Sequence, residues 1–272
     1  MFNKYIKSKL FLTLVAFSFS FSAFAQEVEE VVVTATKKEE STQDIAVSIT
    51  AITADQLAAD QIYDISDLAE VVPGFETAKG VGSGSGFVLR GIGSYGVGAA
   101  VVSSIVTSIN GHSTNPSWFV ETGLLDLERI EVLQGPQGTK FGRNSVQGVI
   151  NLVTKRPTDE FEGYVNVEAG SYDRKLVTGA LNMPFSDSVR GRLAFGSNTR
   201  KGMVENVATG NLMDDRNDVS VRLSLDWDIN DTTELKFTYS GQKEDDNRPQ
   251  EETAYCQPDP FFGCSPYSLG QM

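Results

Sequence analysis

A strict two-residue alternation near the end of the chain constrains its fold more than any other feature. From Val219 to Ile229 every odd position is apolar and every even position is polar. Successive side chains of a β-strand point to opposite faces, so this pattern predicts a strand with one apolar and one polar face. The same alternation returns at Leu235–Tyr239, and weaker versions occur at Tyr164–Ser171, Lys175–Met183 and Val189–Asn198. The sequence therefore predicts about five such strands.

The connections between these strands alternate in length. Residues 184–188 and 230–232 form short links, whereas residues 200–217 and the stretch from 242 onward are long and polar. Short turns on one side and long loops on the other are typical of a transmembrane β-barrel. A soluble β-sandwich also has strands with one apolar face, so the pattern by itself leaves both architectures open.

The start of the chain predicts export. Three lysines precede the apolar run Leu10–Phe21, which leads into Ala23-Phe24-Ala25, and this order is typical of a secretory signal peptide cleaved after Ala25. The alternative is an uncleaved anchor, but the run is shorter than the roughly 20 residues that span a bilayer. The formal net charge of −13 offers no basic surface for nucleic acid, so that class of partner is excluded.

Two further parts lie between the signal peptide and the strands of residues 158–272. Residues 26–43 lack an amphipathic period and are predicted to be a flexible segment. Residues 44–157 are predicted to form an α+β domain, with one helix from a capping box at Thr53–Gln56 to Ala59 and another over Asp64–Val71. Its predicted strands are Ala46–Ile49, Phe87–Arg90, Val101–Ile109, Arg129–Leu133 and Val149–Thr154.

Three motifs in this region resemble one known family. The run from Leu127 to Thr139 continues through Phe141–Asn144 into Gly148–Lys155, and this order closely resembles the plug signature of TonB-dependent outer-membrane receptors. Leu89–Gly93 resembles the family's mid-plug strand and turn. The segment Glu29-Glu30-Val31-Val32-Val33-Thr34-Ala35-Thr36 resembles its TonB box.

The resemblance implies a fold, a location and a partner. The family's fold is an α+β plug domain inside an antiparallel transmembrane β-barrel of about 22 strands. Residues 158–272 then correspond to the first strands of an incomplete barrel, and we expect the chain to be the N-terminal part of a longer receptor. The expected location is the Gram-negative cell outer membrane, in contact with its lipid. The expected periplasmic partner is the TonB C-terminal domain, which would pair with the extended TonB box by β-augmentation.

The resemblance also implies roles for particular side chains. Arg90 and Arg143 match plug arginines that lock onto barrel glutamates, which here would lie beyond Met272; the alternative is that both are solvated or locally paired. Tyr95, His112 and Trp118 fall in the plug loops that face a bound ligand. In the competing interpretation, Trp118 belongs to the plug core and Tyr95 packs against the barrel wall. Other plug charges are expected to be hydrated or paired with barrel side chains, among them Glu128, Arg129, Glu131, Lys155 and Arg156.

The expected function is active uptake of a scarce small-molecule ligand, most simply a ferric siderophore or a similar iron complex. Receptors of the same class for oligosaccharide, haem or cobalamin are the alternatives within the family, and a passive porin or structural barrel is the alternative outside it. A soluble periplasmic enzyme would need a catalytic constellation, and the sequence contains none; no cofactor or metal site is predicted. Cys256 and Cys264 lie in an exported, polar stretch, which favours a disulfide over two free or intermolecular thiols.

Overall fold

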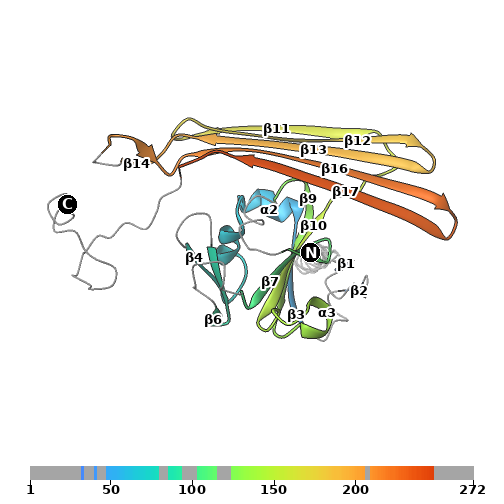
Figure 1. Ribbon diagram of the computed structural model, residues 1–272, viewed down its shortest axis with the longest axis horizontal. Coiled ribbons are helices and arrows are strands. Elements are labelled where there is room, and N and C mark those ends of the chain that lie inside the picture. The colour runs from blue at the N-terminus through green and yellow to red at the C-terminus, as the bar shows by residue number, and fades with distance from the viewer. Residues whose placement is uncertain are drawn as a thin grey trace, which may run out of the picture. The chain divides into compact units, whose positions relative to one another are not determined.

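The structure is a computed structural model that describes residues 32–33, 40–41, 47–79, 85–93, 103–114, 124–205 and 209–247. The predicted signal peptide, residues 1–25, lies outside these ranges, as do Tyr95, Trp118, Cys256 and Cys264. The described residues form two main sheets, and Figure 1 shows the strands of each. No helix among these residues has both the length and the apolar character needed to cross a membrane.

The first sheet is mixed and forms the centre of the plug domain. Its strands follow the order β3-β9-β10-β7-β8, in which β10 pairs parallel with β7 and every other pair is antiparallel. All seven residues of β10 are buried, which fits its place in the middle of the sheet. The strands are β3 (Ser48–Thr53), β7 (Ile105–Ile109), β8 (His112–Thr114), β9 (Leu127–Gln134) and β10 (Gly148–Thr154).

Two short helices cover one face of this sheet. Helix α2 (Ala54–Ala59) begins at the predicted capping box, in which the Thr53 hydroxyl accepts from the Gln56 backbone N–H at 3.4 Å and the Gln56 side chain accepts from the Thr53 N–H at 3.0 Å. The second predicted helix is confirmed as the 3-10 helix η1 (Ile65–Glu70). Its Asp64 cap accepts from the backbone N–H of Ser66 at 3.0 Å. These caps satisfy donors that the first turn leaves free.

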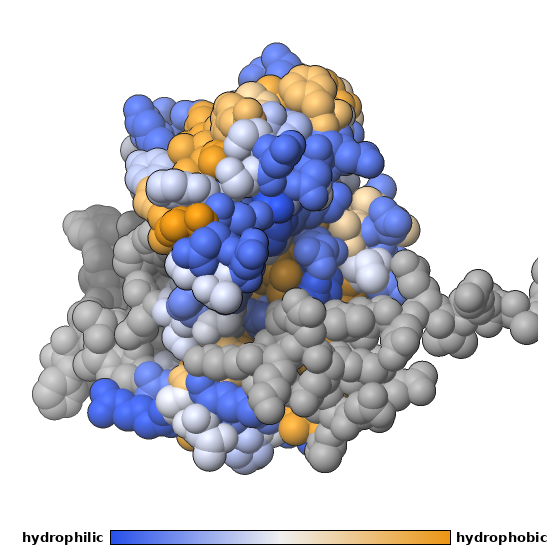
Figure 2. All heavy atoms as spheres, turned by 90° about the vertical axis from the view of Figure 1, so that its right-hand side faces the viewer, coloured by the Kyte–Doolittle hydropathy of each residue, from blue (hydrophilic) through white to orange (hydrophobic). Residues whose placement is uncertain are grey.

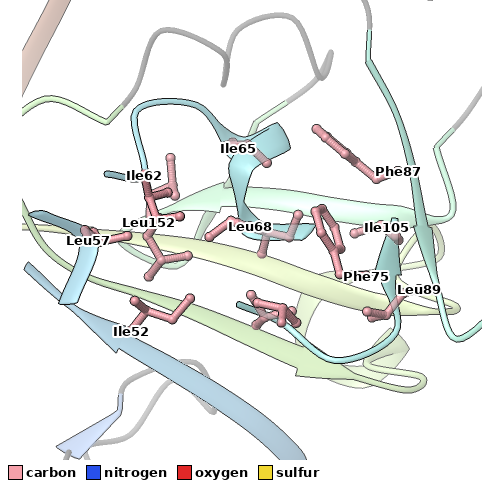
Figure 3. Packing of buried hydrophobic residues seen from close by; sticks show 14 of the residues in the cluster. Ile52, Leu57, Ile62, Ile65, Leu68, Phe75, Phe87, Leu89, Ile105 and Leu152 are labelled. Carbon is pink, nitrogen blue, oxygen red and sulfur yellow. The ribbon is translucent and has the colours of Figure 1, made fainter. Parts of the chain in front are cut away.

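The apolar core of the plug lies between these helices and the sheet. Figure 3 shows side chains from α2, η1, β3 and β10 directed toward one another, and all of those drawn are buried. A small antiparallel sheet, β4 (Phe75–Lys79), β5 (Ser85–Leu89) and β6 (Ile92–Gly93), extends the core, because the rings of Phe75 and Phe87 stack with centroids 5.7 Å apart. A single helical turn, α3 (Gly138–Phe141), connects β9 to β10.

The second sheet confirms the five strands that the alternation predicts. Its order is β11-β12-β13-β16-β17 and all its pairs are antiparallel, with the long strands side by side in Figure 1. The long loop before β16 contains a small hairpin, β14 (Val204–Glu205) and β15 (Leu212–Met213), which the sequence did not predict. The five strands are β11 (Glu162–Gly170), β12 (Arg174–Ser186), β13 (Val189–Arg200), β16 (Arg216–Asn230) and β17 (Thr233–Glu244).

The two faces of this second sheet differ in both chemistry and exposure. From Val219 to Ile229 on β16 the odd positions are apolar and exposed or half-buried, whereas Arg222, Ser224 and Asp226 on the other face are buried. Figure 2 shows orange apolar residues beside blue hydrophilic ones at the molecular surface. The exposed set on these strands includes Val165, Val167, Phe195, Val221, Leu223, Trp227, Leu235, Phe237 and Tyr239. The sheet is therefore apolar toward its surroundings and polar toward its covered side.

Gly148 at the start of β10 provides a test of how tightly the plug sheet packs. A Cβ at this position would lie 2.3 Å from the Leu133 carbonyl oxygen and 2.7 Å from Cδ2 of Leu89. We predict that Gly148→Ala lowers the free energy of unfolding by about 1–3 kcal/mol, measured by chemical denaturation, because backbone atoms must move. Gly138→Ala is the matched control, since nothing lies within 4 Å of its Cβ. Equal stability of the two variants would contradict the tight packing of β9 against β10.

Candidate functional site

A chain of buried polar side chains crosses the plug sheet from β9 to the β7–β8 hairpin. Arg129 Nε donates to Glu131 Oε1 at 2.8 Å, and Asn151 Nδ2 donates to Glu131 Oε2 at 2.9 Å. The Asn151 Oδ1 atom in turn accepts from the Ser108 hydroxyl at 2.7 Å and from the Gly111 backbone N–H at 3.0 Å. Each of these groups is satisfied inside the domain, which removes the cost of burying it.

The β7–β8 hairpin, where this buried network ends, has the tight turn that an Asn-Gly pair favours. Asn110 and Gly111 have φ values of 51° and 76°, as a type I′ turn requires. The Asn110 side-chain oxygen accepts from the Thr154 backbone N–H at 2.9 Å, which fixes the turn against β10. His112 follows on β8 and is exposed. The buried network thus holds a hairpin that presents the only histidine of the sequence at the surface.

The plug contacts the polar face of the second sheet through a buried ion pair. Arg192 on β13 donates to both oxygens of Asp126, from Nε at 2.7 Å and from a terminal nitrogen at 2.8 Å. The hydroxyl of Tyr164 on β11 also donates to Asp126, at 3.2 Å. Arg222 on β16 donates to the Leu125 carbonyl oxygen. Three strands of the second sheet therefore bind two consecutive residues of the plug.

A second ion pair lies nearby, where the plug leads into β11. Arg156 donates to the buried carboxylate of Asp226 on β16, and burial lowers the pKa of the Arg156 guanidinium. The Lys155 backbone N–H donates to the Asp126 carbonyl oxygen at 3.1 Å, so the two pairs are joined through the backbone. Leu125 packs with buried alanines of β12 and β13 beside them. The plug thus contacts this face of the sheet through apolar packing as well as through ion pairs.

The two predicted lock arginines have different surroundings. Arg90 has a φ of 54°, and its Nε donates to Gln134 Oε1 at 2.8 Å, while Gln134 Nε2 donates to the Pro73 carbonyl oxygen at 3.2 Å. Arg143 is exposed after helix α3. The structure therefore brings Arg90 to the end of β9 and leaves Arg143 on the surface. Pairing of either residue with barrel glutamates stays a prediction.

The described part of the TonB box consists of two residues. Val32 and Val33 form β1, which pairs antiparallel with β2 (Glu40–Ser41), and Val33 is buried. The sequence predicts that residues 26–43 stay flexible; in the described residues of this segment a short ladder is formed, for which β-branched valines are well suited. The other six residues of the box lie outside the described ranges.

Of the residues that hold the plug to the sheet, the sequence singled out only Arg156, which was expected to be hydrated or paired with a barrel side chain and pairs with Asp226 on β16. Arg222 and Asp226 could have been found, because charges at buried positions of an alternating strand need partners. Asp126 gives no local signal, since its role depends on Arg192, which lies 66 positions further along the chain. Among the described residues no group of three His, Cys, Asp or Glu side chains is placed to hold a metal ion.

Comparison with known proteins finds a family model that matches the plug domain. Residues 41–149 match the family model described as TonB-dependent Receptor Plug Domain. The ferric yersiniabactin uptake receptor FyuA from Yersinia pestis has a similar structure, with a TM-score of 0.65 and 25% identity over 72% of this chain and 31% of that one. Its likeness extends beyond the plug into the strands, because the aligned part is longer than the plug match.

Two relatives match at the level of sequence. The iron-regulated outer membrane virulence protein of Vibrio cholerae is 30% identical over 185 residues, which are 63% of this chain and 28% of that protein. The vitamin B12 transporter BtuB of Vibrio vulnificus is 29% identical over 184 residues, which are 65% of this chain and 30% of that protein. The chain spans less than a third of the length of these relatives. Residues 41–149 thus match a TonB-dependent receptor plug domain, and the V. cholerae relative is an outer membrane protein.

The contact between Asp126 and Arg192 can be tested with a double-mutant cycle. Both side chains are almost fully buried, so we predict a coupling energy of about 1.5–3 kcal/mol between Asp126→Ala and Arg192→Ala in the free energy of unfolding. The Asp173–Lys201 pair is the matched control, because both side chains are more than 60% exposed and water screens their attraction. No measurable coupling is expected there. Additive effects of the two Asp126–Arg192 substitutions would contradict a direct bond between plug and sheet.

Proposed function

We propose that this chain is the N-terminal part of a receptor that imports a scarce solute across the outer membrane with energy delivered by TonB. The observation that carries the proposal is a plug domain bonded to the polar face of a two-faced strand sheet. A passive porin has no use for a domain that fills its lumen, and a structural barrel has no use for a TonB box. The relatives, one named an outer membrane protein and one a transporter, support a transport receptor over an enzyme.

The proposed solute is a ferric siderophore or a similar iron complex. The names of the V. cholerae relative and of the Y. pestis receptor support iron, since the first is iron-regulated and the second takes up ferric yersiniabactin. Cobalamin is the second candidate, because the V. vulnificus relative is a vitamin B12 transporter of nearly equal identity. Haem and oligosaccharide receptors of the same class complete the alternatives.

The strands are proposed to continue into a larger barrel with lipid on its outer side. The exposed apolar face of the second sheet supports contact with lipid, as barrel strands present alternate apolar residues to the bilayer. Strands β11 and β17 each pair on one side only within the described residues, and an unpaired edge favours a further strand.

Three roles expected from the sequence are part of the proposal. Tyr95, His112 and Trp118 are proposed to face the ligand, and Arg90 and Arg143 to lock the plug onto barrel glutamates. Cys256 and Cys264 are proposed to form a disulfide.

Uptake measurements separate the candidate solutes. Cells that carry the full-length receptor and lack their own iron and cobalamin receptors are given either labelled ferric siderophores or labelled cobalamin. The proposal expects accumulation of an iron complex, and expects it to disappear in cells without TonB. Accumulation of cobalamin alone would assign the second candidate. Accumulation that persists without TonB would contradict the active-transport proposal and favour a passive pore.

The TonB box is tested by a proline substitution. Partner recognition by β-augmentation uses backbone N–H groups, and proline removes one of them and fixes φ. We predict that Val32→Pro leaves ligand binding at the cell surface unchanged and abolishes uptake, and that a peptide spanning residues 26–40 loses its binding to the TonB C-terminal domain. Val32→Ala, which keeps the donor, is the matched control and should retain uptake. Normal uptake by the proline variant would mean that another segment couples the receptor to TonB.

A further inference from the structure

The turn between β7 and β8 contains a chemically labile pair of residues. Asn110–Gly111 is the only asparagine–glycine pair in the sequence. Asparagine deamidates when the backbone nitrogen of the following residue attacks its side-chain carbonyl carbon, and a following glycine has no Cβ to obstruct this attack. Both residues are only half-buried, so water reaches this turn. Whether the pair reacts therefore depends on how the surrounding plug holds the two reacting groups.

The Asn110 side chain is bound to the last residue of β10. Its Oδ1 atom accepts from the Thr154 backbone N–H at 2.9 Å, and its Nδ2 atom donates to the Thr154 hydroxyl at 3.0 Å. A backbone N–H can only donate, so this contact identifies which end of the carboxamide is the oxygen. Ring closure requires the carboxamide carbon to turn toward the Gly111 nitrogen, and the two bonds to Thr154 oppose that rotation.

The attacking nitrogen is held as well. The Gly111 N–H donates at 3.0 Å to Oδ1 of Asn151, a completely buried residue of β10. Attack needs the nitrogen without its proton, and an acceptor bound to the N–H stabilises the protonated form. Asn151 is itself fixed, because its Nδ2 donates to Glu131 at 2.9 Å and its Oδ1 also accepts from the Ser108 hydroxyl at 2.7 Å. The buried network of the plug therefore sets the position of the acceptor that faces Gly111.

Deamidation proceeds through a cyclic imide. The Gly111 nitrogen loses its proton and bonds to the Asn110 Cγ atom, while the Cγ–Nδ2 bond breaks and the side-chain nitrogen leaves with that proton as ammonia. Water then opens the imide at either of its two carbonyl carbons, which gives aspartate or isoaspartate at position 110. Isoaspartate carries the main chain through the side-chain carbons, and this longer path does not fit a two-residue type I′ turn. The reaction would thus alter the hairpin that presents His112.

We propose that Asn110 is a latent deamidation site, protected in the folded plug by Thr154 and Asn151 and modified when the β7–β8 hairpin separates from β10. Three hydrogen bonds of the Asn110 side chain and the Gly111 N–H end on these two residues of β10, so they open together. The rate of modification then follows opening of the hairpin and not the exposure of the turn to water. The inference goes beyond the proposed function and needs no particular solute.

Peptide mass spectrometry of the purified full-length receptor measures this rate. The receptor is incubated in detergent at mildly alkaline pH, either folded or unfolded in denaturant, and aspartate and isoaspartate at position 110 are quantified after digestion. The folded wild type should deamidate about a hundredfold more slowly than the unfolded chain, because three hydrogen bonds oppose the reaction. Asn151→Ala releases the Gly111 N–H and should accelerate the folded receptor about fivefold or more. Equal rates in folded and unfolded wild type would overturn the proposal.

Ser113→Ala is the matched control. Ser113 is exposed on the same hairpin and takes no part in the three protecting bonds, so this variant should deamidate at the wild-type rate. An acceleration equal to that of Asn151→Ala would mean that any change in the hairpin exposes Asn110, and would overturn the role of Asn151.

Asn144, which precedes Ser145 in the same plug, separates local opening from unfolding of the domain. Acceleration at Asn110 without acceleration at Asn144 supports opening of the hairpin alone. If Asn151→Ala accelerates both sites equally or does not assemble, Thr154→Val decides, because it keeps the branched shape and removes only the hydroxyl that accepts from Asn110. This variant should accelerate deamidation at Asn110 at least about threefold. An unchanged rate there, or an equal acceleration at Asn144, would overturn the proposal.

Discussion

The carboxylate of Asp126 is the interaction on which the arrangement of plug and strands depends. The second sheet has a polar face that bears buried arginines, and a buried guanidinium is tolerated only with a partner. Arg192 finds that partner in Asp126, Arg222 binds the neighbouring Leu125 carbonyl, and Asp226 receives Arg156. Plug and sheet thus complete each other's hydrogen bonds. Without the plug, the buried arginines of the sheet would lack hydrogen-bond acceptors, and without the sheet, Leu125 and Asp126 would lack these donors.

These hydrogen bonds and ion pairs attach one side of the plug to the second sheet. Asp126 stands directly before β9, and the polar chain from Arg129 through Glu131 and Asn151 runs on from it to the β7–β8 hairpin. The contacts at Asp126 and the buried network that ends at the hairpin of His112 are thus joined by the first residues of β9. Separation of plug and sheet on this side would break several buried hydrogen bonds and ion pairs at once.

Local signals predicted most of the elements, and contacts distant in sequence account for what was missed. The capping box of Thr53 and Gln56 is complete within four residues, and the alternation of β16 is complete within one strand, so both could be predicted and are confirmed. Strand β4 was missed because its residues have no clear alternation and become a strand by pairing with β5. Strand β3 runs to Thr53, beyond the predicted end at Ile49, because β9 continues alongside it. Asp126 was missed for the same reason, since nothing near it in the sequence signals Arg192.

The central claim is that the second sheet separates an apolar exterior from a plug that covers its polar face. A spin-label scan along β16 in the full-length receptor, reconstituted into lipid, tests it most directly. Labels at Val219, Val221 and Leu223 should be accessible to oxygen dissolved in the bilayer, whereas a label at the buried Ser224 should be immobile and shielded from both oxygen and water-soluble reagents. Accessibility without a two-residue period, or free access of water-soluble reagents to Ser224, would contradict the account.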